Sequence, residues 1–155
     1  MKKILLLHLL CFFLFSISTN AQSSRLEGNW EGTITIGGLD SAEEIPFELY
    51  LKKDGNRQLV GRSYIHFDKD EIVEMEVKGT LFGDFSIYLK DTEFIPFPGE
   101  ENDPPYERKY QLQYQPSIWS TKMVGFWQEL TDQYFSEKRR LGRINLKKVK
   151  DIVKP

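Results

Sequence analysis

Residues 59–81 read LVGRSYIHFDKDEIVEMEVKGTL, and this stretch contains the pattern that decides the fold. On both sides of the charged segment 68–71, every second residue is apolar or small, and most of the residues between them are polar or charged. A period of two places successive side chains on opposite faces of a β-strand. The stretch therefore predicts two antiparallel strands, at 59–67 and 73–81.

The same alternation recurs on both sides of this pair. It predicts six further strands, at 30–36, 47–52, 85–89, 109–114, 119–129 and about 134–148. The connections are too short for helical crossovers, so strands that follow one another in the sequence should pair antiparallel. Closing such a meander removes its exposed edges. We therefore expect an all-β fold, an antiparallel eight-stranded up-and-down barrel, and the alternative is a two-sheet β-sandwich built from the same short strands.

Residues 1–21 differ in composition from the rest of the chain. Lys2 and Lys3 precede an apolar run at 4–17, and a small residue, Ala21, closes the segment. This is the layout of a secretory signal peptide, and the run is shorter than the roughly 20 apolar residues that span a bilayer. We expect cleavage near Ala21, export to the periplasm or the extracellular space, a single barrel domain at 22–155 and no integral membrane span.

The composition of the chain argues against several classes of function. The formal net charge is −2 and becomes more negative without Lys2 and Lys3, which argues against nucleic acid as a partner. The single cysteine, Cys11, lies in the expected signal peptide, and His66 is the only histidine outside it. These residues are too few for a thiolate or zinc site or a histidine-based triad. We expect no cofactor, no metal and no catalytic residue, and the sequence favours a binding protein over an enzyme.

The expected connections differ between the two ends of the barrel. Short turns at 54–55, 83–84 and 115–117 share one end, whereas longer connections at 37–44, 68–71, 91–107 and 130–134 share the other. The long connections are rich in acidic residues, so this rim either is simply solvated or attracts a cationic protein, a basic peptide or calcium. Within 91–107, we expect Phe94, Phe97 and Tyr106 to form a lid or contact surface.

Several side chains should point into the barrel, because they alternate in step with the apolar residues of their strands, and these side chains define a candidate cavity. An eight-stranded barrel is wide enough either to be filled by side chains or to hold one small ligand. Aromatic and hydroxyl groups facing inward fit a ligand-binding wall as well as a packed core. The candidate cavity residues are Ser63, Met75, Tyr110, Tyr114, Trp119, Thr121 and Trp127.

The segment Gly28-Asn29-Trp30, with Leu26 before it and Gly32 after it, resembles the G-x-W signature of the calycin barrels, the superfamily of lipocalins, fatty-acid-binding proteins and avidins. The resemblance implies that Trp30 closes the short-turn end of the barrel. It also implies that a basic residue of the last strand packs over the Trp30 ring, and Arg143 is the candidate.

These observations lead to two expected functions. The first is an exported, non-enzymatic, lipocalin-like binding module that holds a small apolar or aromatic ligand at its long-loop end. The second is a barrel with a solid core that contacts a protein or a glycan through its acidic long loops. A void lined by the candidate cavity residues would favour the first function.

Overall fold

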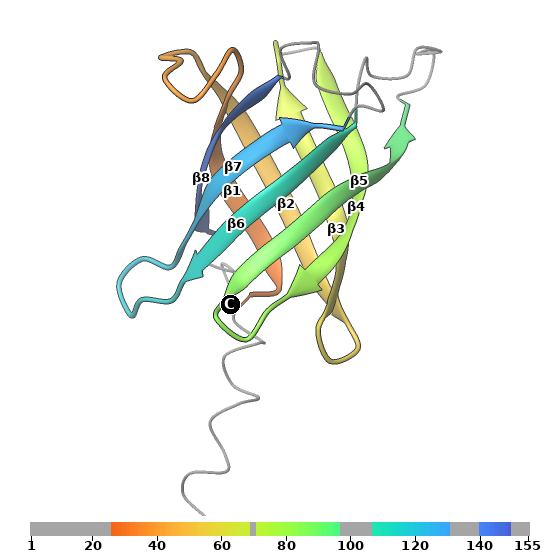
Figure 1. Cartoon of the computed structure of the whole chain (residues 1–155), viewed down its shortest axis with the longest axis vertical. Coiled ribbons are helices and arrows are strands. Elements are labelled where there is room, and N and C mark those ends of the chain that lie inside the picture. The colour runs from red at the N-terminus through yellow and green to blue at the C-terminus, as the bar shows by residue number, and fades with distance from the viewer. Residues whose placement is uncertain (1–25, 69–70, 97–106, 131–139, 150–155) are drawn as a thin grey trace, which may run out of the picture.

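The computed structural model of the protein describes residues 26–68, 71–96, 107–130 and 140–149. Within these ranges the chain forms eight strands, labelled in Figure 1. They are β1 (Gly28–Thr35), β2 (Glu44–Asp54), β3 (Gln58–His66), β4 (Ile72–Leu81), β5 (Ser86–Ile95), β6 (Arg108–Gln115), β7 (Lys122–Glu129) and β8 (Leu141–Lys148). No helix long and apolar enough to cross a membrane occurs among these described residues.

The strands close into a barrel in sequence order, and every neighbouring pair is antiparallel (Figure 1). Closure comes from β1 and β8, whose register runs from Trp30 opposite Lys148 to Ile34 opposite Ile144. The predicted up-and-down barrel is therefore confirmed, and the sandwich alternative is wrong.

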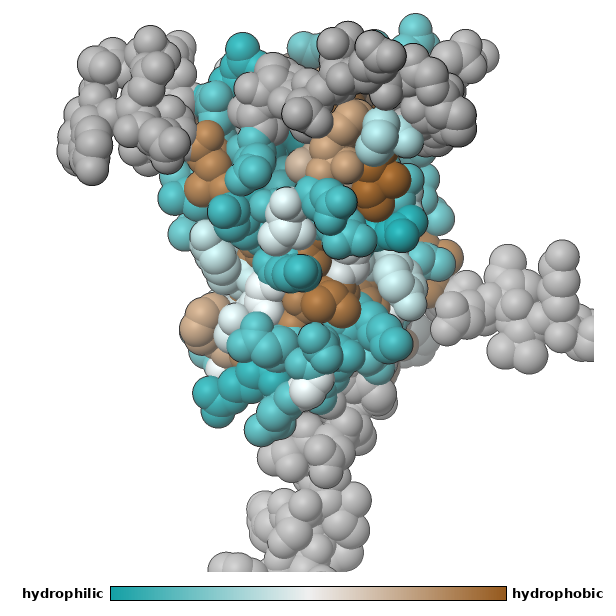
Figure 2. Space-filling view, turned by 90° about the vertical axis from the view of Figure 1, so that its right-hand side faces the viewer, coloured by the Kyte–Doolittle hydropathy of each residue, from teal (hydrophilic) through white to brown (hydrophobic). Residues whose placement is uncertain are grey.

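The alternation read from the sequence separates the interior of the barrel from its wall. On β2, for example, Phe47, Leu49 and Leu51 are buried, whereas Glu48, Tyr50 and Lys52 are exposed. The outer face shown in Figure 2 is mostly hydrophilic, with small and separate hydrophobic areas. The period of two thus builds the core from one side of every strand.

Gly142 allows β8 to approach β1 closely. The indole Nε1–H of Trp127 donates a hydrogen bond to the carbonyl oxygen of Thr35, at 2.8 Å. A Cβ at position 142 would lie 1.8 Å from that oxygen and 2.5 Å from the indole nitrogen. Glycine is therefore required at this position, which agrees with the occurrence of glycine inside an otherwise good strand.

Trp30 closes the short-turn end, as the resemblance implied. Its ring is fully buried, its Nε1–H donates to the Leu26 carbonyl oxygen at 2.9 Å, and the Tyr114 ring meets it edge-on with centroids 6.0 Å apart. The basic residue over the ring is Lys148, whose Nζ lies 5.1 Å from the ring centroid and donates to the Glu27 carbonyl oxygen. Assigning Arg143 to this position was wrong.

The register explains this correction. Lys148 pairs directly with Trp30, so the last residue of β8 reaches the start of β1. Arg143 lies five residues earlier on the outer wall, where its backbone N–H donates to Thr35 Oγ1 at 2.8 Å and its Nη2 donates to the Ser41 carbonyl oxygen at 3.0 Å.

Most expected strand boundaries shift, by up to three residues for β2 (Glu44–Asp54 against 47–52), and three of the shifts affect the candidate site residues or the ends of the barrel. The fifth strand was expected to end at residue 89, but β5 continues to Ile95 through an irregularity in its pairing with β4 between Glu76 and Val77. The seventh was expected to begin at Trp119, but β7 begins at Lys122. The eighth was expected from about residue 134; the described strand begins at Leu141, and residues 131–139 lie outside the described part of the chain.

Candidate functional site

Five of the seven candidate cavity residues face the interior, as predicted. Their side chains are almost completely enclosed, and none has more than 2% of its surface exposed. Such low exposure shows that these side chains are packed against their neighbours within the barrel. They are Ser63, Met75, Tyr110, Tyr114 and Trp127.

The other two candidate cavity residues do not face inward. Trp119 has 85% of its surface exposed, and Thr121 lies in the connection between β6 and β7. The Thr121 hydroxyl donates to the Ser117 carbonyl oxygen at 3.0 Å, and the Ser117 Oγ accepts the Trp119 N–H at 3.2 Å. These local side-chain bonds favour a turn over a strand, because serine and threonine hydroxyls satisfy the backbone there.

A buried polar cluster lies inside the barrel where β5 meets β6. Asp91 Oδ2 accepts the backbone N–H of Arg108 at 3.0 Å, and Asp91 Oδ1 accepts the Tyr110 hydroxyl at 2.7 Å. Arg108 Nη1 lies 3.5 Å from Asp91 Oδ2, and the guanidinium lies 5.8 Å from the centroid of the Trp127 ring. The cluster was missed because Asp91 was assigned to the acidic rim; it is in fact an interior residue of β5.

Burial controls the ionisation of this cluster. Removal from water raises the pKa of Asp91 to about 6, although the nearby positive charge of Arg108 and the bond from Tyr110 oppose the shift. Burial also raises the pKa of Tyr110 well above its usual value. Both Asp91 and Arg108 are enclosed within the core, so the cluster offers no surface at which a substrate meets the carboxylate.

The predicted rim is only partly described. Phe94 belongs to β5, where it is half-buried opposite Met75, while Phe97 and Tyr106 lie outside the described residues. Glu93, like Asp91, lies on β5 and not in a loop. Among the residues that the structure describes, no three histidine, cysteine or acidic side chains gather closely enough to hold a metal ion.

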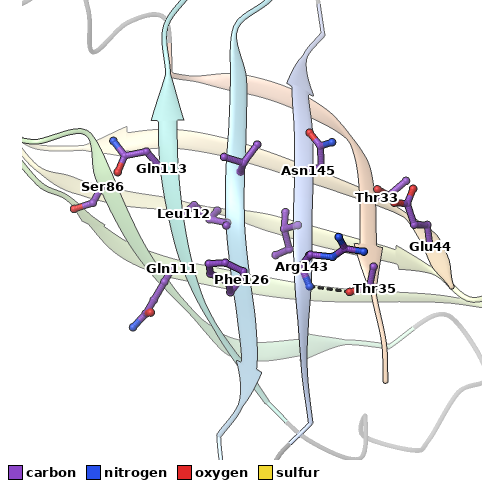
Figure 3. A pocket seen from close by; sticks show the side chains of 13 residues that line it. Thr33, Thr35, Glu44, Ser86, Gln111, Leu112, Gln113, Phe126, Arg143 and Asn145 are labelled. Atoms are coloured by element: carbon purple, nitrogen blue, oxygen red, sulfur yellow. Dashed lines mark hydrogen bonds between the residues drawn. The ribbon is translucent and has the colours of Figure 1, made fainter. Parts of the chain in front are cut away.

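The outer wall carries a groove that sequence reasoning did not anticipate. It has a volume of about 600 Å³ and lies over β6, β7, β8 and β1 (Figure 3). Antiparallel register places its side chains in two rows across the strands. The first row is Gln113, Val124, Asn145 and Thr33, and the second is Gln111, Phe126, Arg143 and Thr35.

The groove combines uncharged polar side chains with the charged Glu44 and Arg143 and with apolar side chains that include the ring of Phe126. Phe126 has 51% of its surface exposed, although it is a large apolar side chain on a wall that is otherwise mostly polar. The side-chain amides of Gln111 and Asn145 make no hydrogen bond within the described part of the chain, and Gln113 Nε2 donates to the Asp84 carbonyl oxygen at 2.9 Å. The arrangement offers donors, acceptors and an apolar surface together.

A smaller hollow of about 210 Å³ adjoins the groove and shares Gln111 and Phe126 with it. Lys109 and Leu141 also line it. The two hollows together form an extended concave surface around Phe126. The polar residues and Phe126 could have been placed outward from strand parity, but their gathering into a groove depends on the curvature of the closed sheet.

No protein-family model matches the chain, and it matches no curated protein and no solved structure. The closed antiparallel barrel is compatible with a calycin-like fold.

Proposed function

We propose that the protein is an exported, non-enzymatic binding domain that holds a neutral, hydroxyl-rich ligand of the carbohydrate class in its outer groove. The observation that carries this proposal is the groove of about 600 Å³ in which the exposed ring of Phe126 lies between Gln111 and Arg143, with the amide of Asn145 and the hydroxyl of Thr33 in the adjacent row.

The chemistry of the groove suits sugars. A sugar hydroxyl both donates and accepts hydrogen bonds, and so does a side-chain amide. Gln111 on β6 and Asn145 on β8 supply amides two strands apart, and Thr33 on β1 supplies a hydroxyl one strand from Asn145, with neighbouring strands about 4.8 Å apart. The apolar face of a sugar ring can lie on Phe126. A binding site that combines a few polar groups with one aromatic surface is typical of small-ligand recognition.

The experiment is calorimetric titration of the protein with neutral gluco-, manno-, galacto- and xylo-oligosaccharides. We expect binding to at least one of them, and Phe126→Ala to weaken it about ten-fold or more through the loss of the aromatic surface. Asn145→Ala should weaken it less, because a solvated hydrogen bond contributes only about 1 kcal/mol.

Tyr50→Ala is the matched control. Tyr50 is an aromatic residue of the outer wall with 41% of its surface exposed, but it lies on β2 and does not line the groove. The control should bind like the parent protein. Equal affinity of the parent and of Phe126→Ala for every oligosaccharide that binds would refute the groove as the site.

The buried cluster of Asp91, Arg108 and Tyr110 favours a second candidate function. Charged groups are rarely enclosed in a purely structural core. They would suit a barrel that opens at its long-loop end to admit a small apolar or aromatic ligand with a polar group. This function requires movement of side chains that are packed in the present structure. Saturable binding of an anilinonaphthalene dye that Tyr110→Phe weakens and Phe126→Ala does not would support this candidate over the groove.

A further inference from the structure

Two large apolar residues project from the short-turn end of the barrel. Ile118 and Trp119 have 86% and 85% of their surfaces exposed, far more than any other large apolar residue that the structure describes. They occupy the connection between β6 and β7, which extends from the barrel at the lower left of Figure 1. We call these two residues the apolar tip.

The turn that carries the apolar tip is fixed by hydrogen bonds. Ser117 Oγ accepts the N–H groups of Trp119 and Ser120 at 3.2 and 3.4 Å. Ser117 and Thr121 bond reciprocally, through Ser117 N–H to Thr121 Oγ1 and Thr121 Oγ1–H to the Ser117 carbonyl oxygen. These hydrogen bonds hold the backbone of the turn in place. Ile118 and Trp119 therefore stay exposed to water, which is unfavourable for apolar side chains.

The neighbouring turn adds a third exposed apolar residue. Phe82 has 48% of its surface exposed in the connection between β4 and β5. This connection is tied to β6, because Tyr114 N–H donates to the Phe85 carbonyl oxygen at 3.0 Å. The acidic residue of this turn, Asp84, is engaged within it: its Oδ1 accepts the Ser86 hydroxyl and backbone N–H.

Two lysines lie directly behind the apolar tip. Lys122 is the first residue of β7 and pairs across the strands with Lys147 of β8, and both are exposed. Lys147 also pairs with the exposed Glu31 of β1 on its other side, so these three side chains together leave one net positive charge at the base of the apolar tip. An apolar tip with a cationic base matches the order of layers in an anionic membrane, with acyl chains inside and charged headgroups outside.

We propose that the short-turn end of the barrel binds the surface of an anionic lipid bilayer. Ile118 and Trp119 enter the interface, and Lys122 and Lys147 contact the phosphate groups. Tryptophan favours this boundary because its ring is apolar while its N–H can still find a partner. Such attachment involves no spanning segment, and it leaves the groove around Phe126 on the side wall accessible.

The readout of the experiment must be local, because the apolar residues 4–17 could bind lipid by themselves. The chain has three tryptophans, and Trp30 and Trp127 are buried, so Trp119 is the one whose fluorescence reports on solvent. We expect its emission to shift to shorter wavelength with vesicles containing phosphatidylglycerol. We also expect quenching by a quencher carried on the lipid acyl chains, and neither effect with pure phosphatidylcholine vesicles.

Three variants complete the experiment, each checked for its unfolding midpoint. Ile118→Ser should weaken the association that the Trp119 signal reports by about ten-fold, and the double variant Lys122→Gln/Lys147→Gln by roughly twenty-fold at low salt. Phe67→Ser, which removes an exposed apolar side chain in the connection between β3 and β4 at the opposite end of the barrel, should leave this association unchanged. An unchanged Trp119 emission with anionic vesicles would overturn the proposal and would leave the apolar tip as a contact for a protein. Equal association of the parent and Ile118→Ser would overturn it as well.

Discussion

At the scale of single residues, Trp30 holds together the short-turn end. It contacts Tyr114, its indole N–H bonds to Leu26 and its ring lies beneath Lys148. We expect Trp30→Ala to lower the free energy of unfolding by about 3–5 kcal/mol, because it empties a large enclosed site. Denaturant unfolding measures this loss, and an unchanged midpoint would exclude the structural role.

Substitution of Lys148 and substitution of Arg143 should affect the free energy of unfolding differently, because only Lys148 lies over the ring of Trp30. Lys148→Met keeps most of the side-chain volume but removes the cation over the ring, which should cost about 1 kcal/mol. Arg143→Met is the matched control on the same strand and should stay within about 0.5 kcal/mol of the parent, because Arg143 lies on the outer wall. The same unfolding measurement compares the two, and the reverse order would restore Arg143 as the partner of Trp30.

At the scale of elements, the pairing of β5 with β6 encloses the ion pair of Asp91 and Arg108. Removing one partner leaves a buried charge uncompensated, so Asp91→Leu and Arg108→Met should each cost about 3–5 kcal/mol. The double variant should be more stable than Asp91→Leu alone, because it buries no charge. A double-mutant cycle of unfolding free energies measures the coupling, and strict additivity would show that the two groups act independently.

The same carboxyl group makes the stability of the barrel depend on pH. Its pKa is about 6 in the folded protein against an ordinary value of 3.8, so the folded state holds the proton more tightly than the unfolded chain does. As the pH rises from about 4 through 6, the stability contributed by Asp91 is lost, by up to about 3 kcal/mol. We therefore expect the parent to lose stability relative to Asp91→Asn over this window. A difference between the two that does not change with pH would contradict the raised pKa.

Strand alternation was sufficient to predict the barrel and its inward side chains, because a period of two is a local property of the sequence. It was not sufficient at the ends of strands. Asp91 keeps the inward alternation of Ile87 and Leu89, and beyond it the irregularity between Glu76 and Val77, which depends on pairing with β4, lets β5 continue to Ile95. Trp119 has the alternation expected of an inward residue of β7. The hydrogen bonds between Ser117 and Thr121 form a turn there instead, so β7 begins only at Lys122.

At the scale of the whole molecule, the interior of the barrel stabilises the fold, whereas we propose that the outer wall binds the ligand. The inward side chains of the described strands pack against one another, whereas the groove around Phe126 lies on the outer wall. Sequence parity places each residue inward or outward, but it does not show whether the interior is full or where the wall is hollowed. Both depend on side-chain volumes and sheet curvature summed around the closed barrel.

The most direct test of this account is the ¹H–¹⁵N correlation spectrum of the protein during titration with the neutral oligosaccharides named above. The side-chain amides of Gln111 and Asn145 report on the groove, and the buried indole N–H groups of Trp30 and Trp127 report on the interior. We predict that the amide signals of Gln111 and Asn145 shift with added ligand while the two indole signals stay in place. Shifts of the Trp127 indole with unchanged amide signals would contradict it and would place the ligand inside the barrel.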